Sequence, residues 1–302
     1  MRPLFDHFYT GRILLLCVWL LAGCASKPPD FQRDTKFDSL DRSARHAFDL
    51  GQHEQAVTLY QAVLNEALKE DDLQAIVATR YNLAASQMSV GEYEEALGQI
   101  NLAVAESERR EAGWDPELTL LRATVLYRAG REQEAQKDLV QLHNGGAEVE
   151  LNVRVSALFL SGLIAAKAGQ ADRLAAIIDA MDKPVTDLAT ANCLELEAWR
   201  LRLEGSADES LSRFTRLADL RRIKQDYRGM NRALSAAADL AEARGNTDTA
   251  AGYLLRAGRS AARLGQPEAR AWLERALRLG TQSSDSALVR EAELELAALR
   301  GD

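Results

Sequence analysis

The sequence predicts an all-α protein built as a solenoid of stacked helical hairpins. A glycine-centred turn motif recurs at nearly constant spacing, and the segments between the turns carry apolar residues at three- and four-residue steps. The 302 residues are 47% hydrophobic and 27% charged, as is typical of folded globular chains. A single helical hairpin cannot bury its apolar face, so repeated copies must stack and share a core.

The turn motif consists of a glycine, three or four polar residues and an alanine, with an aliphatic or aromatic residue four positions further on. Its clearest copy runs from Gly91 to Ala96, with the sequence GEYEEA, and is followed by Ile100. Glycine readily adopts the left-handed conformation in which a helix ends and the chain reverses. Six glycines, about 36 to 40 residues apart, are therefore predicted to lie between the two helices of a hairpin. They are Gly51, Gly91, Gly130, Gly169, Gly205 and Gly245.

The segments between these turns have the periodicity of amphipathic helices. Residues 96–104 illustrate it, with apolar side chains at Ala96, Leu97, Ile100, Ala103 and Val104. Several alanines stand where the two helices of a hairpin are expected to cross, because small side chains let helices approach closely. These alanines are Ala56, Ala84, Ala96, Ala123, Ala135 and Ala250.

Together these motifs resemble the tetratricopeptide repeat. The closest match is Asn82-Leu83-Ala84, followed by the Gly91 turn and Ala103. The resemblance implies a right-handed α–α solenoid of about six hairpins over residues 37–280, in which the first helix of each hairpin lines a concave groove. It is strongest in the first three units, since Leu174 and Ser210 replace the turn alanine in the fourth and fifth.

The end of the array has an ambiguous register. Gly265 follows Gly245 after only 20 residues and begins a turn of its own. The helix expected from about Asp248 to Leu264 either closes one unit or opens the next. Residues 281–302 are predicted to form a turn and a C-terminal capping helix.

Residues 1–23 are predicted to be a signal peptide. The apolar run from Ile13 to Ala22 would span only about 15 Å as a helix, about half of a bilayer core. The sequence Leu21-Ala22-Gly23-Cys24 follows and resembles the lipobox of bacterial lipoproteins. The resemblance implies that Cys24 is lipidated and becomes the first residue of the mature chain. The alternative is an ordinary signal peptide with an incidental cysteine.

Residues 24–36 are predicted to be the lipidated cysteine and a flexible tether. Pro28 and Pro29 oppose a helix there, and the extended segment reaches at most about 45 Å. In lipoproteins of Gram-negative bacteria, an aspartate directly after the cysteine favours the inner membrane. This position is Ala25, so the resemblance implies an outer-membrane anchor and a body facing the periplasm.

The sequence offers few groups for catalysis. The formal net charge of −8 argues against nucleic acid as a partner, because binding to phosphates requires concentrated Lys and Arg. His53-Glu54-Gln55-Ala56-Val57 is close to a zinc motif, but valine stands where the second histidine belongs. No nucleotide-binding glycine motif or nucleophile–base pattern is found. We therefore expect no catalytic residue, no metal, no cofactor and no enzymatic activity.

The first helices are instead expected to present a groove for an apolar or amphipathic peptide of a partner protein. Its middle is apolar and aromatic, while its ends are charged and include Asp41 in the first unit and Glu195 in the fifth. The alternative is that these side chains belong to the core between helices. The predicted peptide-binding residues are Tyr81, Asn82, Met88, Leu120, Tyr127, Phe159, Leu163 and Trp199.

One known subset of the family clamps a peptide carboxylate with basic residues and asparagines. Asn82 matches one clamp position, but Asp41 and Glu117 stand where that subset has lysines. These carboxylates would repel a peptide C-terminus, so a clamp of that type is disfavoured.

The expected function is an outer-membrane-anchored scaffold or adaptor in envelope, peptidoglycan, or pilus and secretion assembly. The alternative is an obligate subunit of one outer-membrane assembly machine. An envelope enzyme is the least favoured hypothesis. Repeat architecture alone does not decide between these, because a fold does not determine its function.

Overall fold

The computed structural model describes residues 36–146, 149–181 and 187–301. Within these ranges it contains fourteen α-helices and no β-strand, in agreement with the predicted all-α solenoid. The predicted signal peptide, the predicted lipidation site Cys24 and most of the predicted tether lie outside the described residues. Among the helices that the structure describes, none is both long enough and apolar enough to span a membrane.

The helices follow one another as hairpins joined by short turns. The first three hairpins are α1 (Lys36–Asp49) and α2 (His53–Glu70), α3 (Leu73–Val90) and α4 (Tyr93–Arg109), and α5 (Pro116–Arg128) and α6 (Glu132–Asn144). The next two are α7 (Leu151–Lys167) and α8 (Ala171–Ala180), and α9 (Asp187–Leu203) and α10 (Ala207–Ile223). The last two are α11 (Tyr227–Ala243) and α12 (Thr247–Arg263), and α13 (Ala269–Gln282) and α14 (Ser286–Ala298).

The six predicted turn glycines all lie between the two helices of a hairpin, with positive φ angles between 68° and 89°. Gly91 shows why the residue matters there. At φ 89° it ends α3, and the next residue's backbone N–H, that of Glu92, donates to the Gln87 carbonyl at 2.9 Å. This bond satisfies a carbonyl that the helix end would otherwise leave without a partner.

The predicted crossing alanines are buried. Ala56, Ala84, Ala96, Ala123, Ala135 and Ala250 are all 0% exposed. Ala84 of α3 and Ala96 of α4 belong to one apolar cluster, which also contains Ile100 and Leu118. The core therefore runs along the stack, between successive hairpins, as expected for a solenoid.

The structure resolves the register at the C-terminal end. Helix α12 follows the Gly245 turn and packs against α11, so it closes the sixth hairpin. Helix α13 also packs on α12, and α14 packs on α13, which makes a seventh hairpin. Helix α14 covers the end of the core with Leu288, Ala292 and Leu296.

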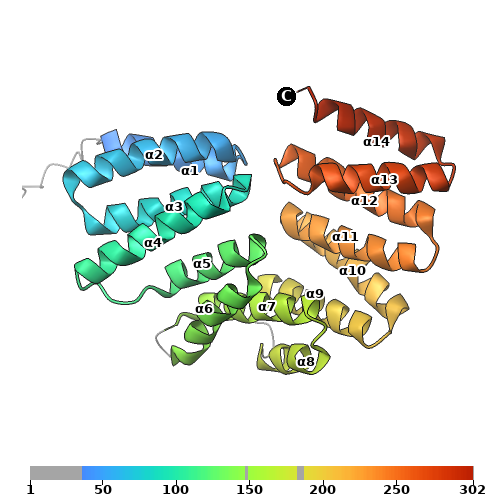
Figure 1. Ribbon diagram of the computed structural model, residues 1–302, viewed down its shortest axis with the longest axis horizontal. Coiled ribbons are helices and arrows are strands. Elements are labelled where there is room, and N and C mark those ends of the chain that lie inside the picture. The colour runs from blue at the N-terminus through green and yellow to red at the C-terminus, as the bar shows by residue number, and fades with distance from the viewer. Residues whose placement is uncertain (1–35, 147–148, 182–186, 302) are drawn as a thin grey trace, which may run out of the picture.

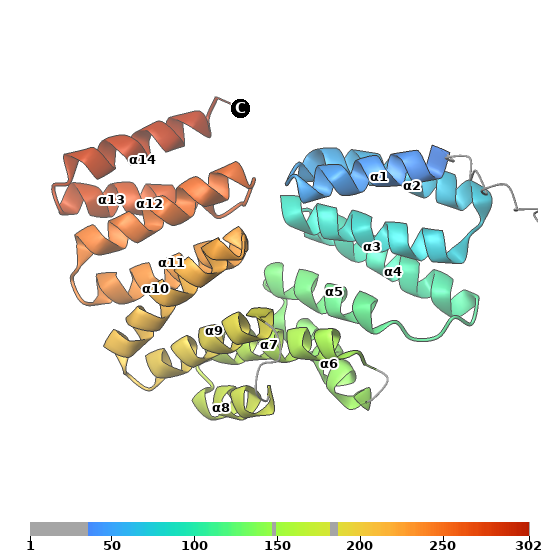
Figure 2. The ribbon, with the colours of Figure 1, turned by 180° about the vertical axis from the view of Figure 1, so that it is seen from behind.

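The stack curves into two arms that face each other (Figures 1 and 2). We call α1–α5 the N-terminal arm and α9–α14 the C-terminal arm; α6–α8 join them at the base. The arms come together where Arg228, at the start of α11, donates from Nη2 to the backbone carbonyl of Ser89 in α3 at 3.2 Å. This contact joins residues that are 139 positions apart in the chain.

Candidate functional site

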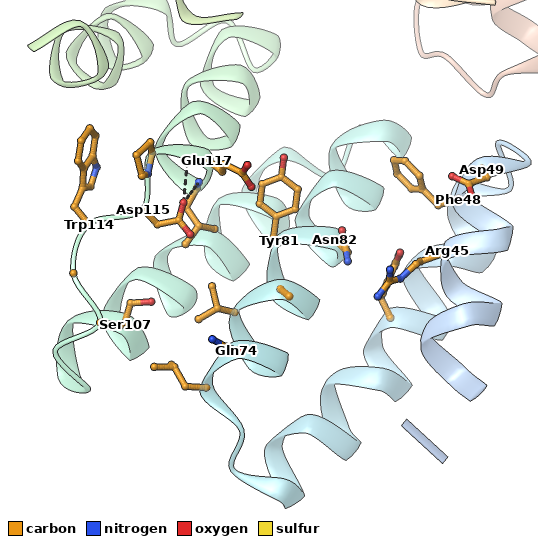
Figure 3. Close-up of a pocket in the computed structure, with 18 residues that line it drawn as sticks. Arg45, Phe48, Asp49, Gln74, Tyr81, Asn82, Ser107, Trp114, Asp115 and Glu117 are labelled. Atoms are coloured by element: carbon orange, nitrogen blue, oxygen red, sulfur yellow. Dashed lines mark hydrogen bonds between the residues drawn. The ribbon is translucent and has the colours of Figure 1, made fainter. Parts of the chain in front are cut away.

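The N-terminal arm contains a pocket of about 800 Å³, formed mainly by the first helices of the first three hairpins. Figure 3 shows the Tyr81 side chain projecting from α3 between side chains of α1 and α5. The pocket follows the concave side that the sequence predicted to bind a peptide. Its aromatic and charged lining includes Arg45, Phe48, Asp49, Tyr60, Tyr81, Trp114, Asp115 and Glu117.

The loop before α5 positions the rim of this pocket. Asp115 caps α5, because its carboxylate accepts hydrogen bonds from the backbone N–H groups of Glu117 at 2.8 Å and Leu118 at 3.1 Å. Pro116 occupies the first turn, where its missing N–H costs no helical hydrogen bond. The Trp114 indole Nε1–H donates to Thr119 Oγ1 at 2.8 Å. These contacts hold Trp114 and Glu117 at the edge of the pocket.

The lining carries an excess of negative charge. Arg45 is the only basic residue in it, and it pairs with Asp41 one turn earlier on α1. Asp49 and Glu117 have no hydrogen-bond or ion-pair partner for their carboxylates among the described residues. Burial, followed by the charges of Glu117 and Asp115, raises the pKa of Tyr81, so its hydroxyl stays protonated and can donate a hydrogen bond.

Five predicted groove residues lie on the same arm. Tyr81 and Asn82 line the pocket. Met88, Leu120 and Tyr127 are half-buried and pack, together with Tyr81, against the core of the arm. Their apolar bodies therefore contribute to the core as well as to the concave side, so the two alternatives considered for these residues are not exclusive.

The other predicted residues lie against intramolecular partners. The Phe159 ring has the guanidinium carbons of Arg221 and Arg232 at 5.8 Å from its centroid. The Trp199 ring packs edge-on against Phe214, with ring centroids 5.1 Å apart. Leu163 is 7% exposed and packs in the core of α7 and α8, so its assignment to the groove is corrected.

Glu195 also differs from the sequence-based expectation. It was assigned to the charged end of the groove, but its side chain is fully buried. Its carboxylate accepts hydrogen bonds from Arg221 Nη2 and Arg232 Nε, both at 2.6 Å. Helix periodicity placed Glu195 on the correct helix, but the face that carries it packs against the neighbouring hairpin.

Sequence reasoning missed Trp114 and Asp115, because it mapped the groove onto first helices only. Both residues belong to the connection between two hairpins. The signal for them was present in the dipeptide Asp115-Pro116, which is typical of a capped helix start. Within the described ranges, no group of three or more His, Cys, Asp or Glu side chains could hold a metal ion.

Stacked helical hairpins whose first helices line an open groove are typical of helical-repeat scaffold proteins. Residues 38–144 match the family described as tetratrico peptide repeat. The matched residues span the first three hairpins, and repeats of this kind form scaffolds for protein–protein interaction.

Several solved structures are similar to the chain at low sequence identity. A tetratricopeptide repeat protein from Parabacteroides merdae is 17% identical, with a TM-score of 0.48 over 85% of this chain and 98% of its own. The apo form of RapI is 11% identical, with a TM-score of 0.46 over 86% of this chain and 75% of its own. The yeast Sti1 TPR2AB domain in complex with pHSP90 is 15% identical, with a TM-score of 0.33 over 86% and 97%. Comparison with curated proteins gave no match.

Proposed function

We propose that this protein is an adaptor lipoprotein of the bacterial envelope. In this proposal, acyl chains on Cys24 hold it at the outer membrane, and its periplasmic repeats bind a segment of a partner protein. The observation that carries the binding role is the pocket on the concave side of the N-terminal arm. The lipobox-like sequence that ends at Cys24 supports the anchor.

The charge of the pocket favours a basic side chain in the bound segment. Within the described ranges, Asp49 and Glu117 have no intramolecular partners for their carboxylates, whereas Arg45 is neutralised by Asp41. The faces of Tyr81, Phe48 and Trp114 supply aromatic surface, on which a lysine or arginine side chain can stack. We therefore expect a partner segment with a basic residue flanked by apolar ones, held in a groove that is aromatic inside and acidic at its rim.

In-cell photo-crosslinking tests the binding role. A photoreactive phenylalanine analogue replaces Gln74 or Ala112, which are exposed residues of the pocket lining. The same analogue at Glu274, exposed on α13 of the other arm, serves as the control. We expect one partner to crosslink from both pocket positions and not from Glu274. Equal products from all three positions would contradict the groove as the binding site.

Membrane flotation tests the anchor. The Cys24→Ser variant should lose its acyl chains and leave the outer-membrane fraction for the soluble periplasmic fraction. Ser26→Ala, two residues further along the tether, is the control that keeps the cysteine. Continued flotation of the serine variant would show that Cys24 is not the anchor. Constant stoichiometry of the captured partner would favour an obligate subunit, and a variable ratio would favour an adaptor.

A further inference from the structure

Two arginines lie where the arms come together. Arg228 of α11 reaches across to the Ser89 carbonyl, while the guanidinium of Arg128, at the end of α5, has no hydrogen-bond or ion-pair partner among the described residues. A cavity of about 320 Å³ lies beside Ser89, at Val90, between the turn of the first hairpin and the connection from α12 to α13. It is lined by His53 and Val90 from one arm and by Leu264 and Gly265 from the other.

The charge of this pair is poorly compensated. Crowding by protein atoms, and then the charge of Arg228, lower the pKa of Arg128 to about 10. The pKa of Arg228 is lowered as well, chiefly by burial. Both guanidinium groups nevertheless remain protonated at physiological pH, so each carries a full positive charge.

The neighbouring acidic groups do not neutralise the pair. The charge of Glu268 acts on both arginines, but among the described residues it forms no ion pair with either of them. Asp226 is bonded to Arg221, and Glu195 is bonded to Arg221 and Arg232. A local positive charge therefore persists inside a protein whose net charge is −8.

Helix geometry relates this pair to the pocket. Glu117 and Arg128 are the second and last residues of α5, eleven positions apart. Eleven residues of α-helix make just over three turns, so these two residues lie on one face, about 16 Å apart along the axis. Since Glu117 lines the pocket, Arg128 lies on the same concave side, deeper between the arms.

We propose that Arg128 and Arg228 form a second subsite, which binds a carboxylate side chain of the polypeptide segment held in the pocket. This inference rests on the proposed function and defines the partner segment further. The planar guanidinium group matches a carboxylate in a two-point hydrogen-bonded fork. An extended chain covers about 16 Å in about five residues. The segment should therefore carry an acidic residue about five positions from its basic one.

Fluorescence anisotropy with a synthetic probe tests the subsite. The probe is a fluorescently labelled, C-terminally amidated tetraglutamate peptide, titrated with the purified full chain in detergent at low salt. We expect saturable binding by the native protein and a loss of affinity of at least tenfold in the double variant Arg128→Gln, Arg228→Gln. The single variant Arg128→Glu should abolish binding, because it places a like charge beside the probe.

The matched control is the double variant Arg256→Gln, Arg278→Gln. These arginines are exposed on α12 and α13 and have no ion-pair partner among the described residues, so the change in net charge is identical. An equal loss of affinity in both double variants, or no binding of the probe by the native protein, would overturn the subsite. Capture of a partner from Gln74 and Ala112 without probe binding would overturn the subsite and leave the proposed function standing.

Discussion

The concave sides of the two arms are built from the same kind of helix but differ in how their charges are used. In the N-terminal arm, Asp49 and Glu117 face the pocket without a hydrogen-bond or ion-pair partner in the part of the chain that the structure describes. In the C-terminal arm, ion pairs connect successive first helices: Glu195 with Arg232, Arg202 with Asp239, and Asp239 and Glu242 with Arg275.

These pairs join residues 33 to 37 positions apart, close to the length of one repeat. They bind α9, α11 and α13 into a ladder, which we call the C-terminal ion-pair ladder. The comparison shows that one repeat architecture supports two uses of the same surface. Where charges of successive units are complementary, they hold the stack together, and where they are left unpaired, they are available to a ligand.

The largest effect should come from the buried end of the ladder. Among the described residues, Glu195→Ala leaves Arg221, which is 3% exposed, with only Asp226 as a counter-ion, and leaves Arg232 with no ion-pair partner. Removing one member of a buried ion pair typically costs about 3–5 kcal/mol of unfolding free energy. Urea unfolding followed by circular dichroism should show this loss. The control Glu197→Ala, which breaks a solvated pair with Arg213, should cost about 1 kcal/mol or less.

The next effect concerns binding in the N-terminal arm. Glu117→Lys reverses a charge that has no intramolecular partner, so partner capture should fall at least tenfold, or about 1.4 kcal/mol. Quantitative pull-down of the crosslinked partner measures this change. Glu274→Lys makes the same change of charge in the other arm and should leave capture unaltered. Similar losses in both variants would show that the pocket is not distinguished from the rest of the surface.

A smaller effect is expected at the solvated part of the ladder. The Asp239 side chain is one-third exposed and pairs with Arg275 at 2.7 Å and with Arg202 at 3.5 Å. Water screens such pairs, so Asp239→Asn should lower the unfolding free energy by about 1 kcal/mol at most. The difference from the native protein should shrink in 1 M salt, because mobile ions screen exposed charges. A difference that is independent of salt would argue against an electrostatic ladder.

The smallest effect should appear where the arms come together. Burial, followed by the charges of Arg228 and Arg128, lowers the pKa of His53. The unfolded chain therefore binds a proton at this residue more readily than the folded protein does. This histidine should destabilise the fold as pH falls below its unfolded value of about 6.5, and should have no such effect above it. The melting temperature should fall between pH 7.5 and pH 5.5, and this fall should be smaller in His53→Gln than in the native protein.

Local features of the fold could be predicted from the sequence because each depends on a few neighbouring residues. The turn glycines take positive φ, and the crossing alanines are fully buried, as their positions in the motif indicated. Some turns give no glycine signal: between α10 and α11 the left-handed position is occupied by Gln225, at φ 60°. Sequence spacing located this connection only approximately.

The candidate site was harder to predict because it depends on how the hairpins rotate against each other. Tyr81 and Asn82, both predicted to line a groove, line the pocket, since both lie on the open face of α3. Glu195 occupies a comparable position on its own helix but is buried by α10 and α11. The small rotation from one hairpin to the next decides which face stays open, and a helical periodicity within one unit carries no information about it.

The bond between Arg228 and Ser89 also has a consequence for the order of folding. In an open solenoid each unit touches only its neighbours, so any hairpin can nucleate the stack. Closing the two arms requires that all the helices between Ser89 and Arg228 have already packed, because the bond spans 139 residues. The arms should therefore join last, as the step with the highest contact order. Small rotations between successive hairpins add up along the stack. A slight change in curvature at α6–α8 would therefore break the bond between Arg228 and Ser89 before it disturbed the packing within either arm.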